Sequence, residues 1–170
     1  MPAQPAPDAS GSTTGDPGDT RTAGVVLHPP VLYGGALIAG LLIDALTPLH
    51  IGLGPWRFGP AIALGLAGLA LGGAAALRFR RVGTPIPTNR PTSALVVGGA
   101  YRWSRNPIYL GLTALYAAIA LAADAPVTLA LLAPVLVVMH YGVIRREERY
   151  LEARFGVAYH RFRGRTRRWL

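Results

Sequence analysis

The sequence predicts an all-α protein: a polytopic membrane bundle of about four transmembrane helices, followed by a C-terminal cytoplasmic amphipathic helix. Hydrophobic residues make up 51% of the 170 residues and charged residues only 15%. Four apolar runs, each about as long as the hydrocarbon core of a bilayer requires, alternate with short segments rich in Arg, Gly or Pro. A chain of this length is sufficient for one compact domain.

The net charge is +9, and all seventeen basic residues are arginines. A strongly basic chain can bind nucleic acid. Beside long apolar runs, however, such charge is typical of cytoplasmic loops and of attraction to anionic lipid head groups. We therefore expect a membrane protein with no nucleic-acid partner. The sequence contains no Cys, which excludes disulfides, a thiolate nucleophile and Cys-ligated metal.

Residues 1–24 are predicted to form a disordered tail, because they contain almost no large apolar side chains. They do not resemble a signal peptide, since a basic leading segment is missing and the apolar run comes too late. The first predicted span, 31–49, carries one charge, Asp44, near its far end. We place Asp44 at the membrane interface, because a carboxylate at the bilayer centre is costly.

The second predicted span, 60–77, follows a Gly- and Pro-rich turn that carries an interfacial aromatic pair. Small residues recur along it at about helical spacing: Ala61, Gly65, Gly68, Gly72 and Ala76. Such spacing lets two helix backbones approach closely, either within one chain or between two. Arginines end this span, and a Pro-rich link follows.

The third and fourth predicted spans, 107–123 and 126–144, are joined by a very short turn at Asp124, and Pro134 predicts a kink in the fourth. The segment 145–170 interleaves aromatic side chains with arginines. This pattern predicts a helix that continues out of the fourth span and then lies on the membrane surface.

The arginine distribution predicts the orientation. Six arginines lie between residues 78 and 106 and nine from residue 145 onward, whereas the turns at 50–60 and 122–126 carry one and none. By the positive-inside rule, the middle loop and the C-terminal helix both face the cytoplasm. Their polar clusters can therefore meet on one side of the membrane.

The segment from Gly98 to Gly111 mixes residue types that rarely share a purely structural element. It brings three aromatic rings, two arginines and Asn106 to the start of an apolar helix. Aromatic faces can hold a cationic or planar ligand, and arginines can bind a carboxylate or phosphate in bidentate fashion. Residues of the same kinds also form ordinary interfacial belts, with paired Glu residues neutralising arginines. Composition alone leaves both interpretations open.

Other sites have little support in the sequence. There is no phosphate-binding loop and no His pair at metal-ligand spacing. His140 is the only His inside an apolar run, and we interpret it as a packing residue. Ser104 has no His partner placed by sequence, so a nucleophilic triad is unsupported. We expect no metal site.

Two motifs together resemble a known family. Gly99-Ala-Tyr-Arg-Trp-Ser-Arg-Asn-Pro-Ile-Tyr-Leu-Gly111 is followed, one helical hairpin later, by Glu147-Glu148-Arg149-Tyr150-Leu151 and Phe155-Gly-Val-Ala-Tyr159. This arrangement resembles the isoprenylcysteine carboxyl methyltransferase and phospholipid methyltransferase superfamily. The resemblance covers residues 83 to about 163, and it implies that 25–170 form an integral membrane methyltransferase-like domain.

The resemblance further implies S-adenosylmethionine-dependent methyl transfer to a lipophilic or membrane-associated acceptor, with the active site facing the cytoplasm. It implies Arg105 and Glu148 as candidate catalytic residues. The cofactor contacts that it implies are Leu95, Val96, Tyr101, Asn106, Pro107, Tyr109 and Glu147. Arg105 has two open roles: it orients an anionic substrate head group, or it pairs with a Glu and fixes the pocket.

Two positions depart from the common family pattern. Asn106 stands where His is usual, and because Asn does not titrate we expect a cofactor contact rather than a general base. Val143 stands one turn before Glu147, where carboxyl-methylating members carry an Arg, and this weakens the transfer of the prenylcysteine substrate to this chain, so that the acceptor stays open between isoprenylcysteine-carboxyl-like and phospholipid-like. The alternative function is a non-enzymatic lipid-binding or assembly protein with the same frame. A small transporter is less favoured, because paired intramembrane charges and an internal repeat are missing.

Overall fold

A computed structural model describes residues 28–83 and 92–169, and in this part of the chain the regular structure is helical. The predicted tail 1–24 and most of the Pro-rich link lie outside the described residues. The helices are α1 (Pro29–Leu46), η1 (Gly54–Arg57), α2 (Phe58–Val82), η2 (Gly99–Arg102), α3 (Pro107–Ala122), α4 (Pro126–Val138), η3 (Met139–Ile144) and α5 (Arg145–Arg165). The predicted all-α membrane bundle is confirmed.

Three segments are long and apolar enough to cross a membrane: Pro29–Leu46, Gly54–Val82 and Pro126–Arg165. The third predicted span differs, because α3 has only 16 residues and is classed as a shorter apolar helix. At about 1.5 Å per residue, α3 is shorter than a bilayer core of about 30 Å. Its start is set by Pro107, which occupies the first helical position after the turn at η2.

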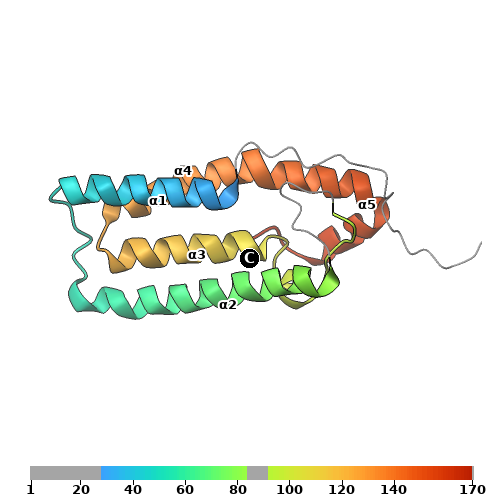
Figure 1. Cartoon of the computed structure of the whole chain (residues 1–170), viewed down its shortest axis with the longest axis horizontal. Coiled ribbons are helices and arrows are strands. Elements are labelled where there is room, and N and C mark those ends of the chain that lie inside the picture. The colour runs from blue at the N-terminus through green and yellow to red at the C-terminus, as the bar shows by residue number, and fades with distance from the viewer. Residues whose placement is uncertain (1–27, 84–91, 170) are drawn as a thin grey trace, which may run out of the picture.

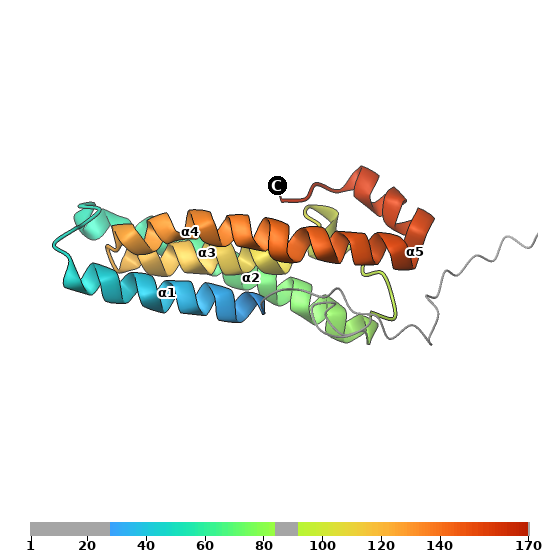
Figure 2. The same cartoon turned by 90° about the horizontal axis from the view of Figure 1, so that it is seen from above.

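The helices form two side-by-side pairs. In Figure 1, α2 lies beside α3, and α1 lies beside α4; Figure 2, turned by 90°, shows α5 extending past the bundle and then turning back. A buried cluster of Tyr33, Tyr109, Tyr116 and residues of α4 and η3 lies between the pairs. Tyr33 Oη lies 2.7 Å from Thr113 Oγ1, which joins α1 to α3.

Small residues bring α2 and α3 into backbone contact. A Cβ built on Gly111 would lie 2.8 Å from the Gly68 carbonyl oxygen and 2.9 Å from the Gly72 backbone nitrogen. The small-residue stripe predicted from sequence therefore packs within the chain at Gly68 and Gly72. In lipid, close backbone packing of this kind replaces the hydrophobic drive that joins helices in water.

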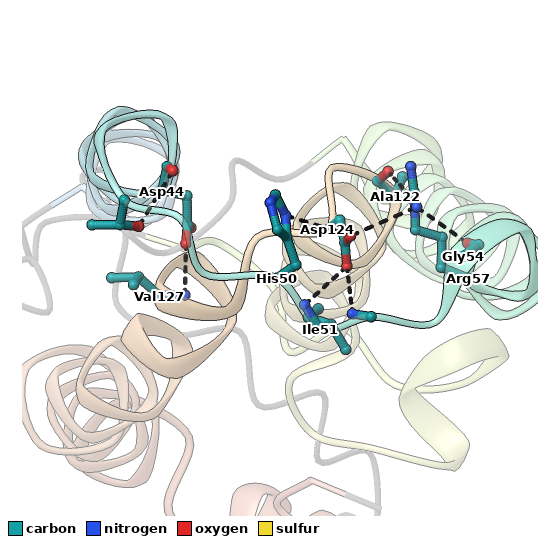
Figure 3. A network of polar contacts seen from close by, with 10 residues as sticks. Asp44, His50, Ile51, Gly54, Arg57, Ala122, Asp124 and Val127 are labelled. Carbon is teal, nitrogen blue, oxygen red and sulfur yellow. Dashed lines mark hydrogen bonds and ion pairs between the residues drawn. The ribbon is translucent and has the colours of Figure 1, made fainter.

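Carboxylates organise the end of the bundle away from α5. Asp44, in the last turn of α1, accepts hydrogen bonds from Val127 N (3.0 Å), Thr128 N (2.8 Å) and Thr128 Oγ1 (2.7 Å). It thus satisfies two of the amides that the first turn of α4 leaves without helical partners, as Figure 3 shows in part. Asp44 therefore has a structural role at the end of α1.

Asp124 ties the neighbouring loop in the same way. Its carboxylate accepts hydrogen bonds from Ile51 N (3.0 Å) and Gly52 N (3.1 Å), and Arg57 Nη1 lies 3.7 Å away (Figure 3). Arg57 also donates from Nε to the Ala122 carbonyl at 3.1 Å. The α1–α2 loop is therefore pinned to the α3–α4 turn.

The far end of the bundle is shaped by two interruptions in one long helical segment. Pro134 lies inside α4, and the chain then passes through a π-helical stretch, η3, into α5. Within α5, Gly156 has φ 44° and ψ −118°, a conformation that favours glycine, and it breaks the helix. The second half of α5 turns back toward the bundle (Figure 2), and α5 ends at Arg165 rather than continuing to residue 170.

We predict that Gly111→Ala destabilises the bundle by about 1–3 kcal/mol, the usual cost of overpacking, because the new methyl group would meet backbone atoms of α2. Thermal unfolding of the purified protein in detergent measures the effect. Gly73→Ala is the matched control, because no atom lies within 4 Å of its Cβ position. Equal melting temperatures for the two variants would contradict the close contact.

Candidate functional site

A cavity lies where η2 and the start of α3 meet α5. Apolar side chains form most of its wall, and the polar side chains that face it come from both predicted motifs. The lining residues are Phe79, Thr92, Ala94, Leu95, Val96, Tyr101, Arg105, Asn106, Ile108, Tyr109, Glu147, Glu148, Leu151, Tyr159 and Phe162. Apolar walls with a few convergent polar groups are typical of small-molecule sites.

The Glu148 carboxylate is bound by two arginines. Arg168 donates from Nε to Oε1 (3.0 Å) and from Nη2 to Oε2 (2.7 Å), a bidentate pair. Arg105 Nη2 lies 3.3 Å from Oε1. The hydrogen bonds to Glu148 raise the pKa of Arg168 above its usual value. Glu148 therefore joins α5 to the turn before α3 and to the C-terminal segment.

The C-terminal segment folds back over the predicted motif. The Arg105 amide donates to the Arg167 carbonyl (2.9 Å), and the Arg168 carbonyl accepts from Asn106 Nδ2 (2.9 Å) and Ser104 Oγ (3.2 Å). Trp169 packs against the buried cluster that contains Tyr109. This segment, which the sequence predicts to lie on the membrane surface, folds back on the protein, where residues 104–106 offer it hydrogen-bond partners.

Glu147 lies on the other side of the cavity. It is buried, and Tyr109 donates a hydrogen bond to its Oε1 at 2.7 Å. Burial, with a smaller contribution from the negative charge of Glu147, raises the pKa of Tyr101 well above its usual value. The Tyr101 phenol therefore remains protonated at neutral pH.

Two polar side chains in the cavity keep unsatisfied donors. The Arg105 side chain is only 10% exposed, and its Nε and Nη1 have no hydrogen-bond partner among the described residues. Thr92 Oγ1, also buried, has none either. Buried polar groups in proteins are nearly always paired, so each exception needs an explanation. A ligand with acceptor oxygens would supply one.

The structure brings together every residue predicted for the site except one. Arg105, Glu148, Leu95, Val96, Tyr101, Asn106, Tyr109 and Glu147 all line the cavity. Pro107 is buried at the start of α3 and does not line it. Of the two roles left open for Arg105, the pairing with Glu148 is present, and its Nε and Nη1 have no hydrogen-bond partner among the described residues. The roles of these residues toward a ligand remain predictions.

Sequence reasoning missed Arg168, which does not line the cavity but binds Glu148 from outside the two motifs. Phe79, Tyr159 and Phe162 were also missed as walls of the cavity. The sequence offered one signal for Tyr159 and Phe162, namely Gly156 just before them. A helix break at this glycine would direct the following residues back toward the bundle. Within the described ranges, no group of three His, Asp or Glu side chains could hold a metal ion.

Apolar helices long enough to cross a membrane, with a partly polar cavity at one end of the bundle, define an integral membrane protein. Residues 57–158 match the family model described as phospholipid methyltransferase, which is more than half of the chain, and the protein belongs to this family. The resemblance seen in the sequence is thereby confirmed. Membership assigns the protein to methyltransferases that act on lipid-type substrates. Comparison with curated proteins finds no match.

We predict that Arg168→Gln loosens the C-terminal segment. Loss of a charge-assisted pair should speed hydrogen exchange at the Arg105 amide by about tenfold or more. Hydrogen exchange read by mass spectrometry on the protein in detergent measures this. The matched control is Arg167→Gln, which removes the same charge from an exposed neighbour. Unchanged exchange in Arg168→Gln would show that the pair does not hold the segment.

Proposed function

We propose that the protein transfers a methyl group from S-adenosylmethionine to a lipophilic acceptor, and that the cavity between η2, α3 and α5 holds the cofactor. The observation that carries the proposal is the combination of Glu147, Glu148 and a partly unpaired Arg105 in one largely apolar cavity. Family membership supports the methyl transfer, and the donor groups in the cavity support the cofactor.

The cavity residues fit the chemical groups of this cofactor. The Nε–H and Nη1–H groups of Arg105 have no partner among the described residues, and each can donate one hydrogen bond to an acceptor oxygen such as that of a carboxylate. The free hydroxyl of Thr92 suits a ribose hydroxyl or an amine. The Glu147 carboxylate and the neighbouring aromatic faces can bind a positively charged group of the cofactor. The apolar wall can contact its flat purine ring.

When bound, S-adenosylmethionine supplies a methyl group attached to a positively charged sulfur. The contribution of this chain is to bind and orient the reactants. Tyr109 holds the Glu147 carboxylate by a 2.7 Å hydrogen bond, so that its negative charge has a fixed position in the cavity. The apolar side chains of Phe79, Val96 and Leu151 line the cavity and disfavour water beside the reactants. Positioning of two reactants in a water-poor site is a large source of rate enhancement.

The arginine distribution supports an active site that faces the cytoplasm. Arg78, Arg80 and Arg81 end α2, and α5 and the residues after it carry nine further arginines on the cavity side of the bundle. The opposite end of the described bundle carries Arg57. Under the positive-inside rule, this asymmetry supports a cavity at the cytoplasmic surface.

Cofactor binding tests the proposal directly. The purified protein in detergent should release or absorb heat on titration with S-adenosylmethionine, and Glu147→Gln should weaken binding by about tenfold or more, as expected for loss of a charge. Arg105→Gln should do the same. Arg149→Gln on the exposed face of α5 is the control. No measurable binding by the parent protein would overturn the proposal and favour a non-enzymatic lipid-binding protein.

Transfer itself is tested with membranes that contain the protein and cofactor labelled in its methyl group. Label should enter the lipid-extractable fraction and should be lost in Glu147→Gln. Label found only in water-soluble products would contradict a lipophilic acceptor, even if the cofactor binds.

A further inference from the structure

A second cavity lies beside the first and has a different character. Three arginines line it, Arg102 from η2 and Arg161 and Arg165 from the returning half of α5. The remaining wall consists of Val97, Gly98, Tyr101, Ala158, Phe162 and Thr166. No Asp or Glu of the described chain is among the lining residues. Tyr101 and Phe162 line both cavities and so form the partition between them.

Among the described residues, no carboxylate neutralises the charge of this cavity. Within residues 28–83 and 92–169, no hydrogen bond or ion pair links Arg102, Arg161 or Arg165 to a carboxylate, whereas the nearby Glu152 pairs with His160 and Arg163. A fourth guanidinium lies at the rim, because Arg78 Nη2 donates to the Val97 carbonyl at 3.5 Å. Like charges gathered without a counterion repel one another, and a bound anion relieves this repulsion.

Exposed apolar side chains accompany the lining residues: Val97, which lines the cavity, is 46% exposed, and Trp103 and Val157, the chain neighbours of Arg102 and Ala158, are 78% and 66% exposed. Trp is enriched at the level of lipid head groups, where its ring lies between apolar and polar surroundings. Guanidinium groups flanked by such residues fit a phosphate at the membrane surface better than a phosphate in free solution.

We propose that this arginine cavity binds the phosphate diester of a membrane phospholipid. Arg102, Arg161 and Arg165 hold the phosphate. The exposed apolar side chains of Val97, Trp103 and Val157 contact the lipid around it. Two of the three arginines lie after residue 158 and thus outside the part of the chain that matches the family model. Under the proposed function, the phospholipid bound here is the methyl acceptor, held next to the cofactor cavity. Binding of its phosphate by the arginines does not rest on the proposed function.

Lipid retention by the full-length protein tests the site without the cofactor. Native mass spectrometry from detergent micelles should show phosphatidylglycerol retained in preference to a diacylglycerol with the same acyl chains. Arg161→Gln/Arg165→Gln should weaken retention by about tenfold or more, the loss expected for charge-assisted hydrogen bonds. Arg102→Gln should weaken it in the same direction. The control removes two exposed arginines elsewhere on α5, Arg145→Gln/Arg149→Gln, and should retain lipid like the parent.

Each of the following outcomes would overturn the assignment of a phospholipid to this cavity. Equal loss in the control pair would indicate diffuse attraction to a basic surface, and equal retention of the two lipids would exclude phosphate recognition. Inorganic phosphate bound by the parent but not by Arg161→Gln/Arg165→Gln, with no lipid retained, would assign the site to free phosphate. Titration with S-adenosylmethionine on the same variants shows whether they fold, and separates failure of this site from failure of the cofactor proposal.

Discussion

The arrangement at the functional end of the molecule depends on one buried carboxylate, that of Glu148. Arg168 binds both of its oxygens and Arg105 approaches one of them, so a single side chain of α5 fixes the turn before α3 and the C-terminal segment. The Glu148 side chain is only 11% exposed, and a buried charge without partners would be strongly unfavourable. The partners must therefore stay in place, and the cavity is closed on that side.

The helices are held together by different interactions at the two ends of the bundle. In lipid, apolar surface gives little drive for helices to associate, so close backbone packing and polar contacts set their arrangement. Gly68, Gly72 and Gly111 provide the backbone packing between α2 and α3. At one end Asp44 and Asp124 satisfy backbone amides, which makes that end a closed structural joint. At the other end the carboxylates meet arginines, and part of one guanidinium remains unpaired.

The fold was predictable from sequence wherever a local pattern decides it. Apolar runs of membrane length predicted the helices, and small residues at helical spacing predicted a close helix contact, which the structure shows between α2 and α3. The site was predictable to the extent that two motifs on the same side of the membrane contribute to it. Asp44 was placed correctly at the end of its helix, but its partner Thr128 lies 84 residues away, and no local pattern indicates that pairing.

The C-terminal segment was not predictable for a related reason. Arg168 is one of nine arginines after residue 144, and nothing in its immediate neighbourhood sets it apart. Its role depends on the break at Gly156, since an unbroken helix would carry it away from the bundle. A helical pattern with one internal Gly does not distinguish a break from a tolerated Gly. The family match also ends at residue 158, before this segment.

The return of the chain after Gly156 explains why two cavities with different sets of charged side chains lie side by side. The returning half of α5 carries Phe162, which lines both cavities, and Arg161 and Arg165, which line only the second. The first cavity has two carboxylates and one arginine in its wall, and the second has three arginines and no carboxylate among the described residues. Because electrostatic complementarity selects ligands by sign, the first favours a cation-bearing molecule and the second an anion. A methyl donor with a positive sulfur and a lipid with a phosphate have these opposite charges, and one wall of aromatic side chains would separate them.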